Sequence, residues 1–133
     1  MTHYDVVAAV IVYENKYLCM QRGDGKYAYV SRKFEFPGGK IEKEESETNA
    51  LKREIREEMA YEIDVMEKLI TVHHSYPDFE ITMHAYLCKP ASSDFMLREH
   101  IGYEWLEAES LHMLDWAPAD LPIVEHIQNS QAR

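Results

Sequence analysis

Two apolar stretches near the N-terminus predict a pair of strands. Residues 5–13, DVVAAVIVY, are β-branched and nearly all apolar, as in a strand that is buried on both faces. The short turn Glu14-Asn15 leads to residues 16–22, which have the composition of a second strand. Phe34-Glu35-Phe36 then alternates around a carboxylate. The turn signal Phe36-Pro37-Gly38-Gly39 is expected to end this extended segment just before a helix.

A helix is predicted within residues 39–61, GKIEKEESETNALKREIREEMAY, which are rich in helix formers. Leu51, Ile55 and Met59 repeat at four-residue steps and form an apolar stripe that can anchor the helix to a core. Ser46 stands where its hydroxyl can accept a hydrogen bond from the first turn, so we expect it to be the N-cap.

The second half of the chain alternates strand patterns with short helices. Tyr76-Pro77-Asp78 is a turn between two strand patterns, and residues 89–99 are polar and irregular. The expected elements are strands 63–74, 80–87 and 103–106 and helices 107–114 and 121–128. No repeat, linker or low-complexity tract interrupts the sequence. We therefore expect residues 1–133 to form one domain of mixed strands and helices.

The net charge of −10 argues against binding to a nucleic-acid polymer, because affinity for a phosphate backbone comes largely from Lys and Arg. An acidic protein still binds nucleotides when metal ions bridge the two negative partners. The start of the chain lacks a basic region, and the longest apolar run, residues 6–12, is too short to span a bilayer. We expect a cytoplasmic protein with no membrane partner and no obligate protein partner.

Cysteine and histidine spacing gives no sign of a zinc site. Cys19 and Cys88 lie far apart in apolar runs, so buried thiols in a reducing compartment are expected. His73, His74 and His84 lie in strand patterns, and neighbouring strand residues face opposite sides. We therefore expect these histidines to be structural or exposed at the surface.

The predicted helix carries a dense group of carboxylates. Glu54, Glu57 and Glu58 share one face, because residues three and four apart are neighbours on a helix. Side by side they repel one another, a poor arrangement for a helix that only has to be stable. Hard divalent cations such as Mg²⁺ bind several oxygen ligands and would relieve this repulsion. The alternative is a solvated acidic face, but the glycines just before the helix allow the backbone to approach a ligand closely.

From Gly39 onward the sequence resembles the Nudix box, Gly-x5-Glu-x7-Arg-Glu-U-x-Glu-Glu-x-Gly-U, in which U is a bulky apolar residue. The matching residues are Gly39, Glu45, Arg53, Glu54, Ile55, Glu57, Glu58 and Tyr61. Ala60 stands where the box has Gly, a departure at the helix exit, where Gly usually supplies a left-handed cap. The resemblance implies the Nudix fold, an α/β/α sandwich around a mixed β-sheet. It also implies hydrolysis of a nucleoside diphosphate linked to another moiety.

The resemblance assigns expected roles at the metal site. The implied ligands of more than one Mg²⁺ or Mn²⁺ ion are Gly39, through its carbonyl, Glu54, Glu57 and Glu58. Glu45 and Arg53 would orient these carboxylates without touching substrate. A further carboxylate from a late loop would hold metal or activate the attacking water. Glu99 is the candidate, and Glu104, in a strand next to Trp105, is the competitor.

Segments outside the box extend the resemblance to MutT-like members and to the CTP pyrophosphohydrolase branch: residues 33–42, 76–78 and 117–122. Glu35 and Asp120 are candidates for reading the base, because an ionised carboxylate accepts hydrogen bonds from an amino group such as that of cytosine. Arg22 is a candidate phosphate or sugar contact, and Phe36, Tyr76 and Phe79 are candidates for stacking on the base. The alternatives are structural: an N-cap at Asp120, a solvated charge at Arg22 and core packing for each of the three aromatic residues.

The expected activity is metal-dependent pyrophosphohydrolysis of nucleoside triphosphates, giving a monophosphate and pyrophosphate. The expected substrates are CTP-like or dCTP-like nucleotides, or oxidised ones such as 8-oxo-dGTP. Alternatives are a Nudix hydrolase of nucleotide sugars or dinucleotides and a non-catalytic nucleotide-binding regulator. Degenerate members usually lose box carboxylates, and all of them are present here, which favours an enzyme.

Overall fold

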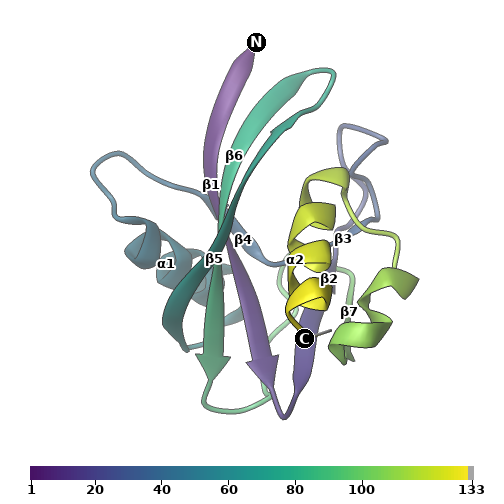
Figure 1. The fold of residues 1–133 in the computed structure, drawn as a ribbon. Helices are drawn as coiled ribbons and strands as arrows, with labels where there is room; N and C mark the ends of the chain where they lie inside the picture. The colour runs from purple at the N-terminus through teal and green to yellow at the C-terminus, as the bar shows by residue number, and fades with distance from the viewer. Residues whose placement is uncertain (132–133) are drawn as a thin grey trace.

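The computed structural model describes residues 1–131, in which a mixed sheet is flanked by helices (Figure 1). The central strand, β1 (Thr2–Tyr13), pairs in parallel with β6 (Phe79–Pro90). β6 pairs in turn with the antiparallel β5 (Ile63–Ser75). All three strands are longer than the sequence patterns predict, because their polar ends also pair with one another. In the second half of the chain the strands and turns are otherwise where the sequence predicts them.

The other edge of β1 is shared by two partners. β4 (Gly38–Lys40) pairs with residues 6–8 in the middle of β1, and β2 (Lys16–Gln21) pairs with its last two residues. β2 also pairs with β3 (Phe34–Glu35) and β7 (Gly102–Leu106). The sheet therefore divides along β1, with β4 on one side of the division and β2 on the other.

The segment predicted to be only a turn, residues 36–39, contains the start of β4. Glycine is required here by close contact: a Cβ on Gly38 would lie 1.9 Å from the carbonyl oxygen of Val7 in β1. A Cβ on Gly39 would lie 2.4 Å from a carboxylate oxygen of Glu54. Gly38 and Gly39 therefore lie in a short strand in close contact with its neighbours. The local sequence pattern does not distinguish such a strand from a turn.

Two helices cover opposite faces of the sheet (Figure 1). α1 (Glu47–Met59) packs Leu51, Ile55 and Met59 against one set of alternate β1 residues. α2 (Leu121–Gln131) packs against the other set. β1 is therefore buried on both faces, and the predicted α/β/α sandwich is confirmed. The predicted helix 107–114 is a 3₁₀ helix, Ala108–Met113.

The ends of α1 follow local rules. Ser46 is the N-cap, and its hydroxyl accepts the N–H of Asn49 at 3.1 Å, as expected. At the other end Ala60 adopts the left-handed conformation, φ 49° and ψ 41°, and its N–H donates to the carbonyl of Arg56. Ala60 thus makes the turn that glycine normally makes, at a cost in backbone strain.

Other expectations concern burial and the membrane. Cys19 and Cys88 are both free and buried. Within residues 1–131, no helix is long and apolar enough to cross a membrane.

Candidate active site

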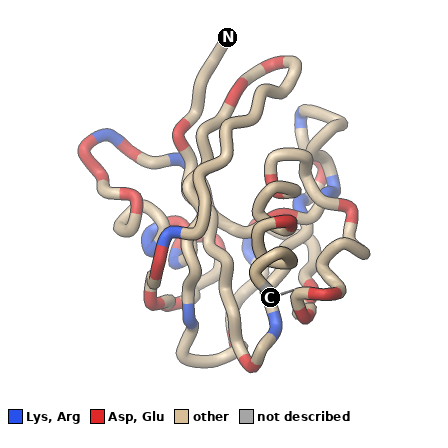
Figure 2. Tube along the Cα trace, viewed as in Figure 1, with Lys and Arg blue, Asp and Glu red and all other residues tan. Residues whose placement is uncertain are grey.

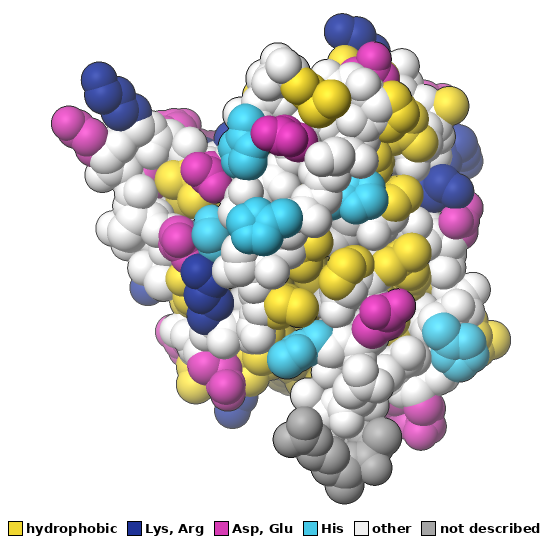
Figure 3. Space-filling view, turned by 45° about the horizontal axis from the view of Figure 1, so that its top comes forward, with side chains coloured by type: hydrophobic (Ala, Val, Ile, Leu, Met, Phe, Trp, Pro, Cys, Tyr) yellow, Lys and Arg dark blue, Asp and Glu magenta, His cyan; other side chains and the backbone are white. Residues whose placement is uncertain are grey.

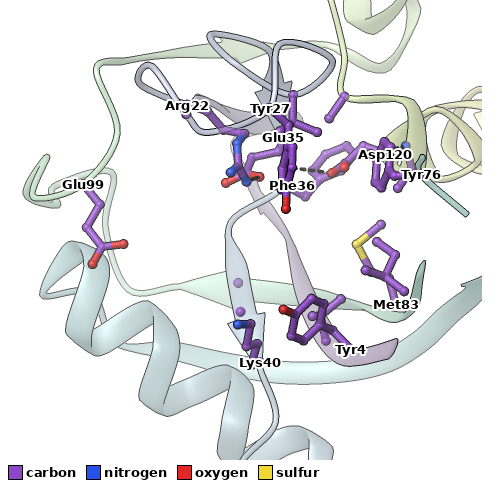
Figure 4. A pocket seen from close by; sticks show the side chains of 18 of the residues that line it. Tyr4, Arg22, Tyr27, Glu35, Phe36, Lys40, Tyr76, Met83, Glu99 and Asp120 are labelled. Atoms are coloured by element: carbon purple, nitrogen blue, oxygen red, sulfur yellow. Dashed lines mark hydrogen bonds and ion pairs between the residues drawn. The ribbon is translucent and has the colours of Figure 1, made fainter. Parts of the chain in front are cut away.

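A cavity of about 580 Å³ opens beside β1 and reaches from the end of α1 to the start of α2 (Figure 4). Its volume is in the range of pockets that bind small molecules. Acidic residues are spread over loops on both sides of the sheet (Figure 2), so charge by itself does not locate the site. The candidate site residues that line the cavity are Arg22, Glu35, Phe36, Gly39, Glu58, Glu99 and Asp120.

Glu58 is the carboxylate of α1 that faces this cavity. It is 8% exposed, and its Oε2 atom has no hydrogen-bond partner among residues 1–131. Burial, together with the negative charges of Glu35, Glu99 and Glu54, raises the pKa of Glu58 to about 9. A buried carboxylate oxygen without a donor is unfavourable, and a cation is the partner that would remove this cost.

Arg53 holds the other carboxylates of the box in place. Its Nε and Nη2 donate to both oxygens of Glu45, at 2.7 and 2.9 Å. Its Nη1 donates to Glu54 at 2.9 Å and to Glu57 at 3.2 Å, while Nη2 also reaches the carbonyl of Lys40 at 3.0 Å. The hydrogen bonds from Arg53 and from the N–H of Glu42 lower the pKa of Glu45 to about 2. These are the contacts that an orienting role for Arg53 and Glu45 requires.

The chemistry of these groups fits a hard divalent cation, since the carboxylates and the Gly39 carbonyl are all oxygen donors. Among residues 1–131, however, no three His, Cys, Asp or Glu side chains are gathered into a ready-made metal site. The reason is visible in the contacts: Arg53 holds Glu54 and Glu57, whereas Glu58 is buried beside the cavity. A cation would supply the charge that draws these oxygens together.

Glu35 forms the centre of the other end of the cavity. Arg22 Nη1 donates to its Oε1 at 2.9 Å, and His100 Nε2 lies 2.9 Å from its Oε2. Burial opposes the charge of Glu35, but the hydrogen bond from His100 and the charge of Arg22 outweigh it and lower the pKa of Glu35. Both oxygens of this predicted base-reading acid are therefore occupied by protein donors, and Arg22 is tied to Glu35.

Asp120 is the second buried acid at this end, and it is 5% exposed. Its Oδ2 accepts the backbone N–H of Phe36 at 2.9 Å, so the carboxylate joins the start of α2 to the end of β3. Burial and the charge of Glu35 raise the pKa of Asp120 well above its usual value. This direction favours the neutral acid, which donates as well as accepts, whereas the sequence argument for base reading assumed an ionised acceptor.

Phe36 contributes to the site mainly through its backbone. The side chain is 3% exposed, and its ring stacks on Trp116 with the centroids 4.7 Å apart. This is the core packing weighed as the alternative to stacking on a base. The aromatic rings at the mouth of the cavity belong instead to Tyr4, Tyr27 and Phe79, which are only partly buried.

Of the two late carboxylates, Glu99 is the one at the cavity. In Figure 4 it stands above the end of α1, across the cavity from Asp120 and Tyr76. It is exposed, and its charge acts on Glu58. Glu104 lies on β7, where it pairs with Cys19 of β2. The structure therefore brings the predicted first choice, Glu99, to the box carboxylates.

His100 is a site residue that the sequence analysis missed. It follows Glu99 directly, and proximity to a candidate carboxylate was the available signal. Figure 3 shows several histidines close together on one face of the molecule. His73, expected to be structural or at the surface, is exposed, and its Nδ1 lies 3.2 Å from the hydroxyl of Thr82. Grouping histidines by strand pattern did not single out the one in the loop.

The divided mixed sheet between two helices, with the box at the mouth of the cavity, defines a hydrolase fold of the Nudix class. The chain belongs to that family, since the model of the NUDIX domain matches residues 6–126. The protein is accordingly a Nudix hydrolase, and enzymes of this family generally use divalent metal ions.

Two curated relatives cover nearly the whole chain. The CTP pyrophosphohydrolase of Escherichia coli (strain K12) is 33% identical over 125 residues, which are 94% of this chain and 91% of that protein. The 8-oxo-dGTP diphosphatase of the same organism is 27% identical over 128 residues, 96% of this chain and 98% of that one.

Solved structures agree in fold. The solution structure of the E. coli ORF135 protein has a TM-score of 0.81 at 32% identity, over 99% of this chain and 93% of that one. The MutT protein from Methanosarcina mazei Go1 has a TM-score of 0.86 at 21% identity, over 99% and 97%, a likeness that concerns the fold alone.

Proposed function

We propose that this Nudix hydrolase is a pyrophosphohydrolase of nucleoside triphosphates that uses Mg²⁺ or Mn²⁺ and releases a monophosphate and pyrophosphate. The observation that carries the proposal is a cavity that joins Glu58, whose buried Oε2 has no partner within residues 1–131, at one end to the buried acids Glu35 and Asp120 at the other. The two ends of a nucleotide differ in a matching way, because its phosphates bind cations and its base forms hydrogen bonds. The relatives named for CTP and 8-oxo-dGTP are consistent with this substrate class.

At the phosphate end, Glu54, Glu57, Glu58 and the Gly39 carbonyl would hold the cation. A bound divalent cation neutralises phosphate charge and acidifies the attacking water. Arg53 would keep Glu54 and Glu57 in a fixed orientation, through the contacts at 2.9 and 3.2 Å. Glu99, on the opposite wall, would accept a proton from the water.

At the base end, one Asp120 oxygen is occupied by the N–H of Phe36, and the other would read the base. In the free protein the raised pKa of Asp120 favours its neutral form. An amino group on the base would donate to Asp120 and favour the charged form again, because a hydrogen bond to the carboxylate stabilises it. A cytosine nucleotide fits this requirement, as does the amino group of an oxidised guanine.

The test is a substrate panel with and without Mg²⁺ that follows pyrophosphate and orthophosphate separately. The panel contains CTP, dCTP, UTP, GTP, 8-oxo-dGTP, a UDP-sugar and ADP-ribose. We expect metal-dependent pyrophosphate release from triphosphates, with a cytosine or oxidised guanine nucleotide preferred. Turnover restricted to the sugar or dinucleotide-like substrates would contradict the proposed substrate class. Binding without turnover would contradict the proposed reaction.

A further inference from the structure

Glu99 lies between two residues whose side chains are anchored on opposite walls of the cavity. The loop that carries it connects β6 to β7. On one side, Arg98 Nη1 donates to the carbonyl of Glu57 at 3.3 Å. This carbonyl belongs to the last turn of α1, where backbone acceptors lack partners within the helix. Arg98 therefore fastens the loop to the helix that carries the box.

On the other side, His100 fastens the loop to β3. Its Nε2 lies 2.9 Å from Oε2 of Glu35, and the two side chains are 6% and 19% exposed. An ionised carboxylate only accepts, so Nε2 carries the proton in this contact. Arg22 occupies the second oxygen of Glu35 at 2.9 Å and keeps the acceptor in place. The anchor is thus a buried contact to an acid that is itself held.

The backbone of the loop is fixed just outside these residues. The N–H of Met96 donates to the carbonyl of Met59 at 2.9 Å, and the N–H of Ile101 donates to the carbonyl of Gln21 at 3.0 Å. Between these two points Leu97 and Glu99 are exposed, whereas the side chain of His100 is only 6% exposed. Within residues 97–100, the side chain of His100 is therefore the one that packing holds in place.

We propose that His100 is a positioning residue: by donating to Glu35 it holds the arch of residues 97–100 so that Glu99 faces the box carboxylates across the cavity. The same contact ties the position of Glu99 to the acid at the base end. The effect on turnover rests on the proposed function, in which Glu99 takes part in the chemistry. The anchoring of the loop does not rest on it.

The test uses three variants of the full chain. His100→Leu fills a similar volume but removes the donor, and His100→Gln places an amide donor near the position of Nε2. The matched control is His73→Leu, which removes a histidine bonded to Thr82 on the exposed sheet face. For each variant, kcat and KM are measured on the best triphosphate, and hydrogen exchange is followed at the amides of Met96 and Ile101, whose N–H groups are hydrogen-bonded at the two ends of the loop.

We expect His100→Leu to lower kcat by about tenfold to a hundredfold, since a small misplacement of a reacting group has effects of this size. Its Met96 and Ile101 amides should exchange at least about tenfold faster than those of the unaltered protein. His100→Gln should recover most of both losses, and His73→Leu should change neither. If His100→Leu does not fold, His100→Asn replaces it, because its shorter amide stops short of Glu35 but leaves a polar gap.

The proposal is overturned if the folded variant keeps kcat within about twofold, or if exchange at Met96 and Ile101 is unchanged. It is also overturned if His100→Gln is as impaired as His100→Leu. Should the unaltered protein hydrolyse no triphosphate, the proposed function fails, and exchange alone decides the anchor. The anchor is then supported if exchange is faster in His100→Leu and returns to the rate of the unaltered protein in His100→Gln. It is overturned if exchange in His100→Leu is unchanged.

Discussion

The two ends of the cavity both gather acids, but they satisfy them differently. At the phosphate end, Glu54 and Glu57 share one guanidinium, and Glu58 keeps a buried oxygen that no donor within residues 1–131 reaches. At the base end, Glu35 accepts from Arg22 and His100, and both of its oxygens are used. The hydrogen bonding of the acid is incomplete at one end and complete at the other, although Arg22 Nε and His100 Nδ1, on the two groups that hold Glu35, have no partner within residues 1–131.

The pKa directions express this difference. Burial and the negative charges of neighbouring carboxylates raise the pKa of Glu58 to about 9, because both disfavour its charged form. The pKa of Glu35 is lowered although burial opposes its charge, because His100 and Arg22 donate to it. An acid left without donors marks a place where a cation is expected. An acid held by donors is a fixed part of the wall, which can position other groups.

The largest expected effect is at the phosphate end. Glu57→Gln removes a negative charge where the cation is proposed to bind, while its i,i+4 contact with Arg53 is largely exposed and contributes little to stability. We expect the variant to fold and to lose about a thousandfold or more in kcat. The measurement is steady-state kinetics at saturating Mg²⁺, together with the thermal unfolding midpoint.

Glu67→Gln is the matched control, since it makes the same change at an exposed position of β5, outside the cavity. It should leave kcat unaltered. A folded Glu57→Gln protein with nearly unchanged kcat would show that the acids of α1 do not hold the catalytic cation. The contrast between the two ends would then lose its functional meaning.

The two ends also differ in how far the sequence predicts them. The phosphate end lies within residues 39–61, so the helix period, the N-cap at Ser46 and the shared face of the carboxylates follow from local spacing. The base end depends on contacts across the chain: His100 and Glu35 are 65 residues apart, and Asp120 and Phe36 are 84 apart. Spacing indicates that such acids are present. It does not indicate which donors the folded chain brings to them.

The same limit explains the differences in the fold. β4 is three residues long and contains two glycines, so by local composition it is a turn. It becomes a strand because Gly38 lets it lie directly against Val7 of β1. The burial of β1 on both faces was predictable, because consecutive residues of its apolar stretch point to opposite faces and are nearly all apolar. A long apolar pattern thus predicts its element without tertiary information. A short segment whose conformation depends on a neighbouring strand is not predicted in this way.

A substitution of Asp120 at the base end should alter the preference between CTP and UTP more than it alters kcat. The raised pKa of Asp120 implies a neutral acid at lower pH and an ionised acceptor at higher pH. The preference for CTP over UTP in kcat/KM should therefore rise with pH, by up to about one to two decades, as one charge-assisted hydrogen bond is gained. In Asp120→Asn the ratio should no longer depend on pH, because the amide does not titrate.

Asp115→Asn is the control, since Asp115 is exposed and bonds Lys33 at the surface. It should retain the pH dependence of the unaltered protein. The CTP-to-UTP ratio could instead be independent of pH in the unaltered protein, or depend on pH equally in Asp120→Asn. Either result would leave Asp120 with only its structural contact to Phe36. That outcome would leave the base end without an acid that reads the base.

The smallest expected effect concerns the exit of α1, where local rules should apply with little influence from the cavity. Ala60 holds the left-handed conformation, φ 49° and ψ 41°, which costs a residue with a Cβ about 1–2 kcal/mol. Glycine removes that strain but loses more entropy on folding, which offsets about 0.4–1 kcal/mol. Ala60→Gly should therefore stabilise the protein by about 1 kcal/mol and raise the unfolding midpoint by about 4 °C.

Ala50→Gly provides the opposite sign, because Ala50 is buried within α1 and glycine there weakens the helix by about 1 kcal/mol and removes a packed methyl group. Denaturant unfolding of both variants gives the two free energies, and kinetics on CTP and UTP give the functional comparison. Ala60→Gly should leave kcat and the CTP-to-UTP ratio unchanged, since neither end of the cavity depends on the strain. A less stable Ala60→Gly protein would mean that the alanine methyl packs favourably enough to outweigh the left-handed backbone. A changed ratio would mean that the exit of α1 is coupled to the acids at the base end.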